Sequence, residues 1–465
     1  MSIQLLFFIC LIGVVINAPV LPSLTDVSPI VPIIDFFIFF AISYSINNRF
    51  LKGYSRKQKN HFFSIYLFGF LICLFFLKVC WVPNLPPNSP DWGFDPQRYY
   101  SYAQEVLEKG YYDGWVGSGM NGIVYFYALI FRIFGCHPLV PLYLNSIFAL
   151  TSALMLFSIF EEKLYKKPYY AAYLLLIPEF LYYNIMVSKD TLCQYGIIFI
   201  LYEFYRYYKR RKLINLILLI ISFIFLIIIR SPYALVALGA IIIFLLFFSS
   251  KISLFKKISI LTVMLLAVLV GLSYTNILSS GDSMTNDWNS RIEDTMTGNI
   301  NSMEEGSALA AYLTPNNIVE VFIFGVIRSI AYLSPSGYYR FFDEPSWYTF
   351  AALTTLLTGL ITSGIILVVF QYIIKVYKQK EDRMILFLLF FFLSMFLTGF
   401  STPNFIHARY RVTYEILYFM PVILSYAEFG KRNFYKQIKN FLVIVLILIP
   451  VSYTHLRAHE TLMNL

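Results

Sequence analysis

The 465-residue sequence has few charged residues, few cysteines and no segment that would separate domains. Charged residues make up only 13% of the chain, whereas a soluble globular protein has about 25%. The five cysteines show no C-x-x-C spacing, so the sequence indicates neither a disulfide framework nor a cysteine-ligated zinc site. We find no internal repeat and no Gly/Ser-rich linker, and we therefore expect a single domain.

Apolar residues are abundant. They account for 58% of the chain, aromatic residues for 19%, and the mean hydropathy is +0.67. This is more apolar surface than a soluble core can bury, with too few charges to cover it. The composition excludes a large soluble enzyme, a disordered chain and a disulfide-rich secreted domain, and it indicates a polytopic membrane protein.

The net charge of +10 is unevenly distributed along the chain. Six short hydrophilic breaks contain 24 Lys/Arg and 4 Asp/Glu, whereas two longer breaks contain 11 Asp/Glu and 3 Lys/Arg. This asymmetry follows the positive-inside rule and predicts cytoplasmic basic breaks and external acidic ones. The charge therefore does not indicate nucleic acid as a partner; the lipid bilayer is the expected one. The basic breaks are Asn47–Lys59, Glu161–Pro168, Tyr205–Lys212, Lys251–Lys257, Lys375–Arg383 and Gly430–Asn440, and the acidic ones are Pro83–Met120 and Ser279–Pro315.

Long apolar runs predict an all-α bundle of about 11–13 transmembrane spans, since crossing the hydrocarbon takes roughly 20 residues. Asn121–Gly135 is expected to lie at the outer surface as an interfacial helix, and Asn316–Leu333 is expected to be either a helix that dips into the membrane or a second surface helix. The spans are expected at Ser2–Asn17, Pro29–Ile46, Phe62–Val82, Pro138–Phe160, Tyr169–Val187, Thr191–Tyr205, Leu213–Ile229, Pro232–Phe248, Ile258–Leu278, Trp347–Ile374, Met384–Phe400, Val412–Ala427 and Phe441–Pro450.

The last fifteen residues, Val451–Leu465, differ abruptly from the apolar run before them. They resemble translated sequencing-adapter read-through, so we exclude them from fold prediction and expect the natural C-terminus to be missing. The predicted membrane domain is residues 1–450.

The acidic break Pro83–Met120 contains the most informative residues. Asp95 is followed by Pro96 and a predicted helix, a pattern typical of an N-cap with proline at the first helical position. Asp95 could therefore only cap the helix, or it could be a carboxylate held at the membrane surface to act as a base.

The spacing of Asp95, Arg98, Tyr99, Ala103, Leu107 and Gly110 resembles the first external loop of GT-C glycosyltransferases. These polytopic enzymes, which include the protein mannosyltransferase and aminoarabinose-transferase-like groups, take a sugar from a polyprenyl-phosphate donor. In that family an aromatic surface helix follows the loop, as Tyr125–Gly135 does here, and a second acidic residue lies in the next external turn. Asp190 of Ser188–Thr191 matches that residue. The resemblance covers roughly Phe62 to Phe248.

The resemblance implies that Asp95 is the general base and that Asp190 positions the acceptor or helps to hold a divalent cation such as Mg or Mn. No cofactor is required by the sequence. Asp190 could instead cap its helix. The resemblance also implies that Arg98 and Tyr99 bind substrate.

Basic residues at the external edges are candidates for binding the donor phosphate, because guanidinium groups pair with phosphate oxygens. Each candidate also has an alternative that involves no phosphate. Lys189 could be an ordinary interfacial cation, and Arg230 could snorkel to lipid headgroups. The remaining candidates could pair with the acidic loops. The candidates are Lys189, Arg230, His407, Arg409 and Arg411.

The predicted function is an inverting membrane glycosyltransferase that moves a sugar from a polyprenyl-phosphate-linked donor to a glycan, lipid or protein acceptor. The resemblance implies a bacterial plasma membrane with the active site facing outside. Two alternatives remain: a polymerase of polysaccharide repeat units of the O-antigen type, and a flippase or transporter of lipid-linked sugars.

Overall fold

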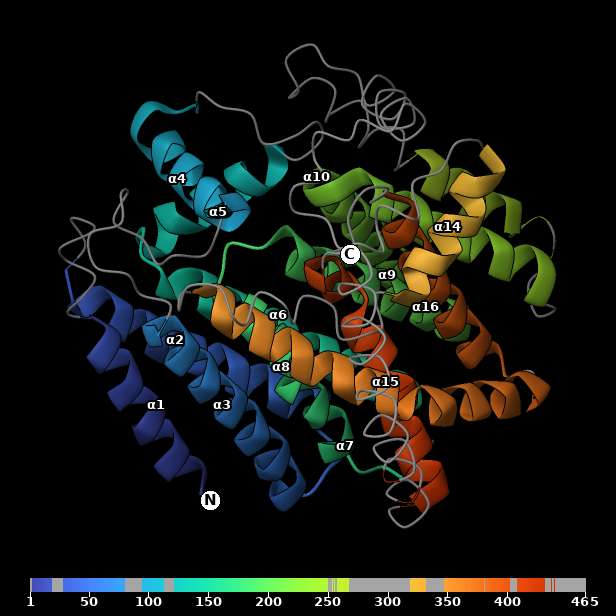
Figure 1. Cartoon of the computed structure of the whole chain (residues 1–465), viewed down its shortest axis with the longest axis horizontal. Helices are drawn as coiled ribbons and strands as arrows, with labels where there is room; N and C mark the ends of the chain where they lie inside the picture. The colour runs from blue at the N-terminus through green and yellow to red at the C-terminus, as the bar shows by residue number, and fades with distance from the viewer. Residues whose placement is uncertain are drawn as a thin grey trace, which may run out of the picture.

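The computed structural model describes residues 2–18, 28–79, 94–112, 121–249, 253, 255, 257–266, 318–331, 347–379, 381–401, 408–430, 436 and 439. Every regular element within these ranges is a helix, which confirms the all-α fold class (Figure 1). The elements are α1 (Ile3–Asn17), α2 (Ile30–Phe50), α3 (Arg56–Val79), α4 (Phe94–Lys109), α5 (Asn121–Phe134), α6 (Leu139–Phe160), α7 (Tyr169–Ala172), η2 (Tyr173–Leu176), α8 (Pro178–Tyr183), α9 (Lys189–Arg210), α10 (Leu213–Ile243), η3 (Phe244–Phe248), α14 (Ile318–Ala331), α15 (Trp347–Gln379), α16 (Asp382–Ser401) and η6 (Ala408–Thr413), and further helices cover residues 257–266 and 415–430.

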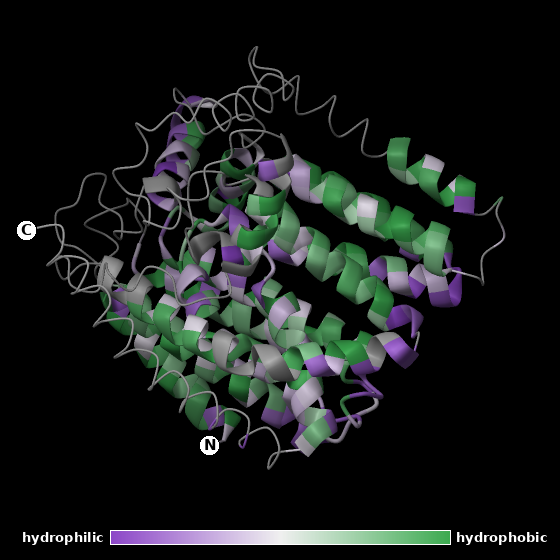
Figure 2. Ribbon diagram, turned by 45° about the vertical axis from the view of Figure 1, so that its right-hand side comes forward, coloured by the Kyte–Doolittle hydropathy of each residue, from purple (hydrophilic) through white to green (hydrophobic). Residues whose placement is uncertain are grey.

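Five helices within the described ranges are long and apolar enough to cross a membrane. Their outer faces expose large apolar side chains, such as Ile34 of α2, Phe75 of α3 and Ile221 of α10, which a water-soluble protein would bury. Apolar residues run along the helices and polar ones gather towards their ends (Figure 2). The chain is therefore a polytopic membrane protein. The five stretches are Ile30–Phe50, Arg56–Val79, Leu139–Phe160, Leu213–Phe248 and Asp382–Gly399.

The segment expected to form one span at Tyr169–Val187 is not a continuous helix. It is divided into α7, η2 and α8, and an extended backbone at Ile177 separates the last two. Pro178 is the cause, because the residue before a proline is sterically disfavoured in the α region. The expectation of a single span here was wrong: the hydropathy of the segment is that of a span, but its backbone is interrupted.

The 31-residue helix α10 doubles back at Arg230, where the backbone is extended with φ −165° and ψ 96°. A straight helix of that length would end about 46 Å from its start. Instead, the ring of Phe244 lies 5.3 Å from that of Tyr208, near the end of α9 from which α10 starts. The two spans expected at Leu213–Ile229 and Pro232–Phe248 are therefore the two arms of a hairpin whose tip is Arg230.

Four of the six basic breaks are joined to one another by side-chain contacts. Gln58 donates to the carbonyl of Lys166 at 3.3 Å, which joins the break before α3 to the one after α6. Lys163 pairs with Glu381 at 2.6 Å, which adds the break before α16. The hydroxyl of Tyr208, in the break after α9, donates to Asp382 at 2.9 Å. Residues that the charge pattern assigned to one side of the membrane thus share one face of the molecule, called here the basic face.

The opposite end of the bundle is formed by the start of α9, the tip of the α10 hairpin and the pair α4–α5. Helix α9 has 22 residues and runs away from the basic face towards its own N-terminus, a distance of about 33 Å. Figure 1 shows α4 and α5 on the side of the molecule away from α7, which follows the basic break after α6. This far end, opposite the basic face, contains most of the candidate site residues within the described ranges.

We expect the ion pairs of the basic face to make a small, pH-dependent contribution to stability. Burial tends to raise the pKa of Glu381, but hydrogen bonds from Lys163 and Arg383 outweigh it and lower that pKa. A lowered pKa stabilises the fold above the carboxyl's unfolded pKa and loses this contribution as pH falls through the folded pKa. Between about pH 6 and pH 3 the thermal midpoint of the wild type in detergent should therefore fall more than that of Glu381→Gln. The difference should be small because water screens these half-exposed charges; parallel curves would contradict it.

Candidate functional site

The start of α9 places a carboxylate at the far end of the bundle. Ser188 is the N-cap of this helix, and its hydroxyl accepts from the backbone N–H groups of Asp190 at 3.2 Å and Thr191 at 3.4 Å. Because Ser188 caps the helix, the Asp190 carboxylate is not needed for that role. The side chain of Asp190 is instead available for contacts with other elements, although the helix buries it to 2% exposure.

The tip of the α10 hairpin supplies the partner of Asp190. The guanidinium of Arg230 lies 3.4 Å from the Asp190 carboxylate, and both side chains are buried. The guanidinium also lies over the ring of Tyr233, 5.2 Å from its centroid. The hydroxyl of Tyr233 in turn contacts Thr398 of α16 and Thr413 of η6 at 3.2 and 3.0 Å. Arg230 therefore does not simply extend towards lipid headgroups: it pairs with Asp190 inside the bundle.

Lys189 joins α9 to the helix that carries the Asp95 motif. Its ammonium donates to the hydroxyl of Tyr99 at 2.9 Å and lies 5.5 Å from the centroid of the same ring. Both residues are buried, with 6% of Lys189 and 3% of Tyr99 exposed. Tyr99 and Lys189 are separated by 90 residues in the sequence. The two short segments that resemble the GT-C pattern are thus in direct contact.

Asp95 lies in the first turn of α4, which begins one residue earlier, at Phe94. The expectation that Asp95 is the N-cap was therefore off by about one position, within the usual uncertainty of helix ends. Its side chain lies outside the described residues. Asp95 and Tyr99 are four residues apart in the sequence, so the two positions are about one helical turn apart on α4. Arg98 is half-buried.

A side-chain network supports the turn that leads from α8 to Ser188. The amide of Asn145, on α6, donates to the carbonyls of Asn184 at 3.0 Å and Met186 at 2.7 Å. The hydroxyl of Tyr127, on α5, donates to the other end of the same amide at 3.1 Å. The loop between α8 and α9 has few backbone hydrogen bonds of its own, and the Asn145 side chain supplies donors for two of its carbonyls. This holds the start of α9 against both α5 and α6.

Helix α5 meets the α10 hairpin at Gly122. A Cβ atom built on this glycine would lie 2.0 Å from the carbonyl oxygen of Ile228, two residues before Arg230. Only a glycine permits this backbone contact. The buried side of α5 includes Val124 and Tyr127, whereas Leu129 and Ile133 are exposed. The expected short apolar helix is therefore present, and its position at the membrane surface stays a prediction.

Arg411, a candidate for phosphate binding, is completely buried in a second cluster of charges. Its Nε donates to Glu179 at 2.8 Å, and Nη2 donates to the same oxygen. The carboxylate of Glu415 lies 3.8 Å from Arg411, and the hydroxyl of Thr355 donates to Glu179 at 3.4 Å. The cluster joins α8, α15 and η6. In this arrangement Arg411 pairs with carboxylates of the bundle interior, so phosphate binding there would require it to change partners.

The structure does not describe the side chains of the two remaining candidates, His407 and Arg409. His407 lies outside the described residues, and the side chain of Arg409 does too, although its backbone belongs to η6. Within the described ranges, no group of three or more His, Cys, Asp or Glu could hold a metal ion. The structure thus brings together Tyr99, Lys189, Asp190 and Arg230, and it places Arg411 in a separate cluster.

Sequence reasoning missed the residues that hold this arrangement in place, namely Asn145, Glu179 and Tyr233. Asn145 and Glu179 each interrupt a long apolar run. A polar or ionisable residue inside a membrane span is costly unless it has a partner, so that interruption is a usable signal. Tyr233 carried no such signal, because one tyrosine among 37 in an aromatic-rich chain is not distinctive.

We expect Gly122→Val to destabilise the protein by about 1–3 kcal/mol, because added side-chain atoms would displace the α10 backbone beside Arg230. Thermal unfolding in detergent measures this change. Gly239→Val is the matched control, since nothing lies within 4 Å of a Cβ built there. Equal losses in the two variants would show that the contact between α5 and α10 is not tight.

We expect Arg411→Met to cost about 3–5 kcal/mol of stability, because it leaves Glu179 and Glu415 buried without a cation. Arg411→Met combined with Glu179→Met should recover most of that loss, as seen when buried ion pairs are replaced by apolar groups. Unfolding titrations would measure both. Arg383→Met, which removes a half-exposed ion pair on the basic face, is the control and should change little. A double variant less stable than the single one would refute a structural role for the pair.

No protein-family model matches the sequence, and no curated protein matches it. Among solved structures, the chain is similar to the archaeal oligosaccharyltransferase AglB from Archaeoglobus fulgidus, in complex with an inhibitory peptide and a dolichol-phosphate. The TM-score is 0.44 and the sequence identity 14%, over 86% of this chain. The match spans 56% of the length of that neighbour.

Proposed function

We propose that the protein is a membrane glycosyltransferase that moves a sugar from a polyprenyl-phosphate-linked donor to an acceptor hydroxyl. The reaction would take place at the far end of the bundle, which would face the outside of a bacterial plasma membrane. One observation carries the proposal: Lys189 and Tyr99 are in contact at 2.9 Å. That contact joins the helix of the Asp95 motif to the turn containing Asp190, the two segments that the GT-C resemblance pairs.

Asp95 is the proposed general base. Its carboxylate would take the proton of the acceptor hydroxyl as the acceptor oxygen bonds to the anomeric carbon of the sugar. The bond between that carbon and the phosphate oxygen breaks at the same time, and polyprenyl phosphate leaves with the electron pair. Attack opposite to the leaving group inverts the anomeric configuration. Asp95 lies in the first turn of α4, four residues before Tyr99, and this position in the chain supports the proposal.

Lys189 and Arg230 are the proposed stabilisers of the leaving phosphate. Both are cations in a buried environment, where fixed charges act on a developing anion more strongly than in water. Asp190 holds Arg230 at 3.4 Å and so fixes the orientation of the guanidinium. In this proposal Asp190 is a positioning residue with respect to the phosphate. Binding of a divalent cation by Asp95 and Asp190 stays open as an addition to this scheme.

A transporter of lipid-linked sugars is the second candidate function. The observation that favours it is the broken segment α7–η2–α8 with Glu179 and Arg411 buried beside it. Discontinuous helices and interior charges are typical of secondary transporters. The glycosyltransferase remains the better-supported function because the contacts of Lys189, Asp190 and Arg230 lie at one end of the bundle and not midway through it.

We expect Asp95→Asn to reduce transfer of label from polyprenyl-phosphate sugars by at least about 100-fold, which is the usual contribution of a general base. Asp190→Asn should reduce it less, because it loosens Arg230 without removing the base. The assay uses purified full-length protein, a panel of labelled donors and their acceptors. Glu108→Gln, an exposed carboxyl on the same helix α4, is the matched control and should transfer at the wild-type rate.

The outcome of the same assay decides between the two functions. Wild-type transfer by Asp95→Asn would refute its assignment as the base. If none of the donors gave transfer while vesicles containing the protein moved the lipid-linked sugar across the bilayer, the transporter would be the correct function.

A further inference from the structure

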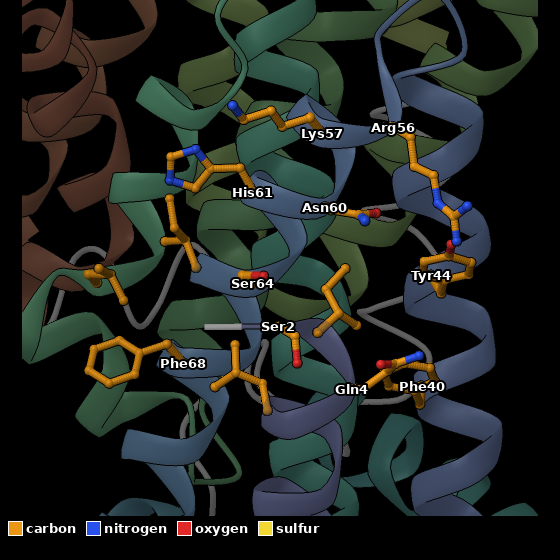
Figure 3. A pocket seen from close by; sticks show the side chains of 14 residues that line it. Ser2, Gln4, Phe40, Tyr44, Arg56, Lys57, Asn60, His61, Ser64 and Phe68 are labelled. Carbon is orange, nitrogen blue, oxygen red and sulfur yellow. The ribbon is translucent and has the colours of Figure 1, made fainter.

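A cavity of about 1070 Å³ opens near the basic face, far from the candidate site. It lies between the N-terminus of α1, the middle of α2 and the first turns of α3 (Figure 3). Ser2, Tyr44, Asn60 and Ser64 are among its polar lining residues. Its size is at the upper end of the range typical of small-molecule sites, about 300–1,000 Å³. Neither the proposed glycosyl transfer nor the transport alternative uses it.

The upper part of the cavity is positively charged. Arg56, Lys57 and His61 line it from the first two turns of α3, and the residues lining the cavity include no Asp or Glu. Figure 3 shows Arg56 beside Tyr44 on one side and Lys57 and His61 on the other. Within the described ranges, no ion pair engages Arg56 or Lys57, and both side chains are exposed. The N-terminus of α1, the positive end of a helix dipole, lies at the same cavity.

The lower part of the cavity is apolar and continues onto the lipid-facing surface. Phe40, Ile65 and Leu176 line it, and so does Phe68, which is 45% exposed. Leu5, adjacent to the lining residue Gln4, is 50% exposed on the outer face of α1. A cationic end and an apolar end that opens sideways match a molecule with an anionic headgroup and an acyl chain. A soluble phosphate compound would use only the first of these features.

We propose that this cavity binds an anionic phospholipid from the leaflet at the basic face. Its phosphate would lie at the end of the cavity lined by Arg56 and Lys57, and an acyl chain would lie along Phe40 and Phe68. Basic pockets between transmembrane helices on the cytoplasmic side are a known mode of binding anionic headgroups. The site does not depend on the proposed function, because it involves none of the residues of the candidate site.

The test is native mass spectrometry of the full chain, delipidated in detergent and then given equal amounts of phosphatidylglycerol and phosphatidylcholine. We expect the wild type to retain phosphatidylglycerol in preference to phosphatidylcholine. Arg56→Gln combined with Lys57→Gln should weaken phosphatidylglycerol binding by about 10- to 30-fold, since each cation near a lipid surface contributes about 1 kcal/mol. Ser64→Phe, which fills the cavity without changing its charge, should also weaken binding.

Lys166→Gln combined with Lys167→Gln is the matched control. It removes the same charge from exposed residues on the same face but outside the cavity, and it should retain the lipid as the wild type does. Equal loss in this control would overturn the site in favour of general charge attraction. Equal retention of phosphatidylcholine and phosphatidylglycerol by the wild type would also overturn it. Displacement of the lipid by glycerol phosphate alone would show that the occupant is a soluble phosphate and would refute the lipid assignment.

Discussion

A bundle of apolar helices has no water inside it, so every backbone group that a helix leaves unpaired needs another hydrogen-bond partner. The described part of the chain interrupts its helices at a few places, and side chains supply partners for the backbone around the start of α9. Asn145 pairs with the carbonyls before α9, and Ser188 with the amides at its start. At Arg230 the backbone is extended, and the guanidinium turns back to Asp190. The candidate site is built from these compensations.

The two buried charge clusters differ in where they lie relative to the ends and interruptions of the helices. Asp190 and Arg230 lie where helices begin and turn, beside segments that the sequence pattern assigned to the membrane surface. Glu179 and Arg411 lie where an interrupted helix meets α15 and η6. The first pair lies next to Lys189, which contacts Tyr99 of α4. The second pair mainly fixes how interior segments meet.

Much of the fold could be predicted from the sequence, because long apolar runs and the sign of the charged breaks depend only on composition. The contacts of Gln58 with Lys166, Lys163 with Glu381 and Tyr208 with Asp382 confirm that four of those breaks share a face. The break at Pro178 was missed because hydropathy does not report backbone conformation. The partners of Arg230 and Arg411 were also beyond prediction, since an arginine at the end of a span looks the same whether it reaches lipid, phosphate or a buried carboxylate. The roles of Asp95, His407 and Arg409 stay predictions.

The hairpin of α10 also restricts the number of residues in each of its arms. Its two arms leave and regain the region around Tyr208, and α5 touches the backbone at Ile228. One residue added to the first arm would turn every later side chain by about 100° around the helix axis and advance it by about 1.5 Å. Arg230 would then no longer face Asp190. Relatives of this chain can therefore exchange apolar residues along the arms freely, but an insertion there should be accompanied by a compensating deletion.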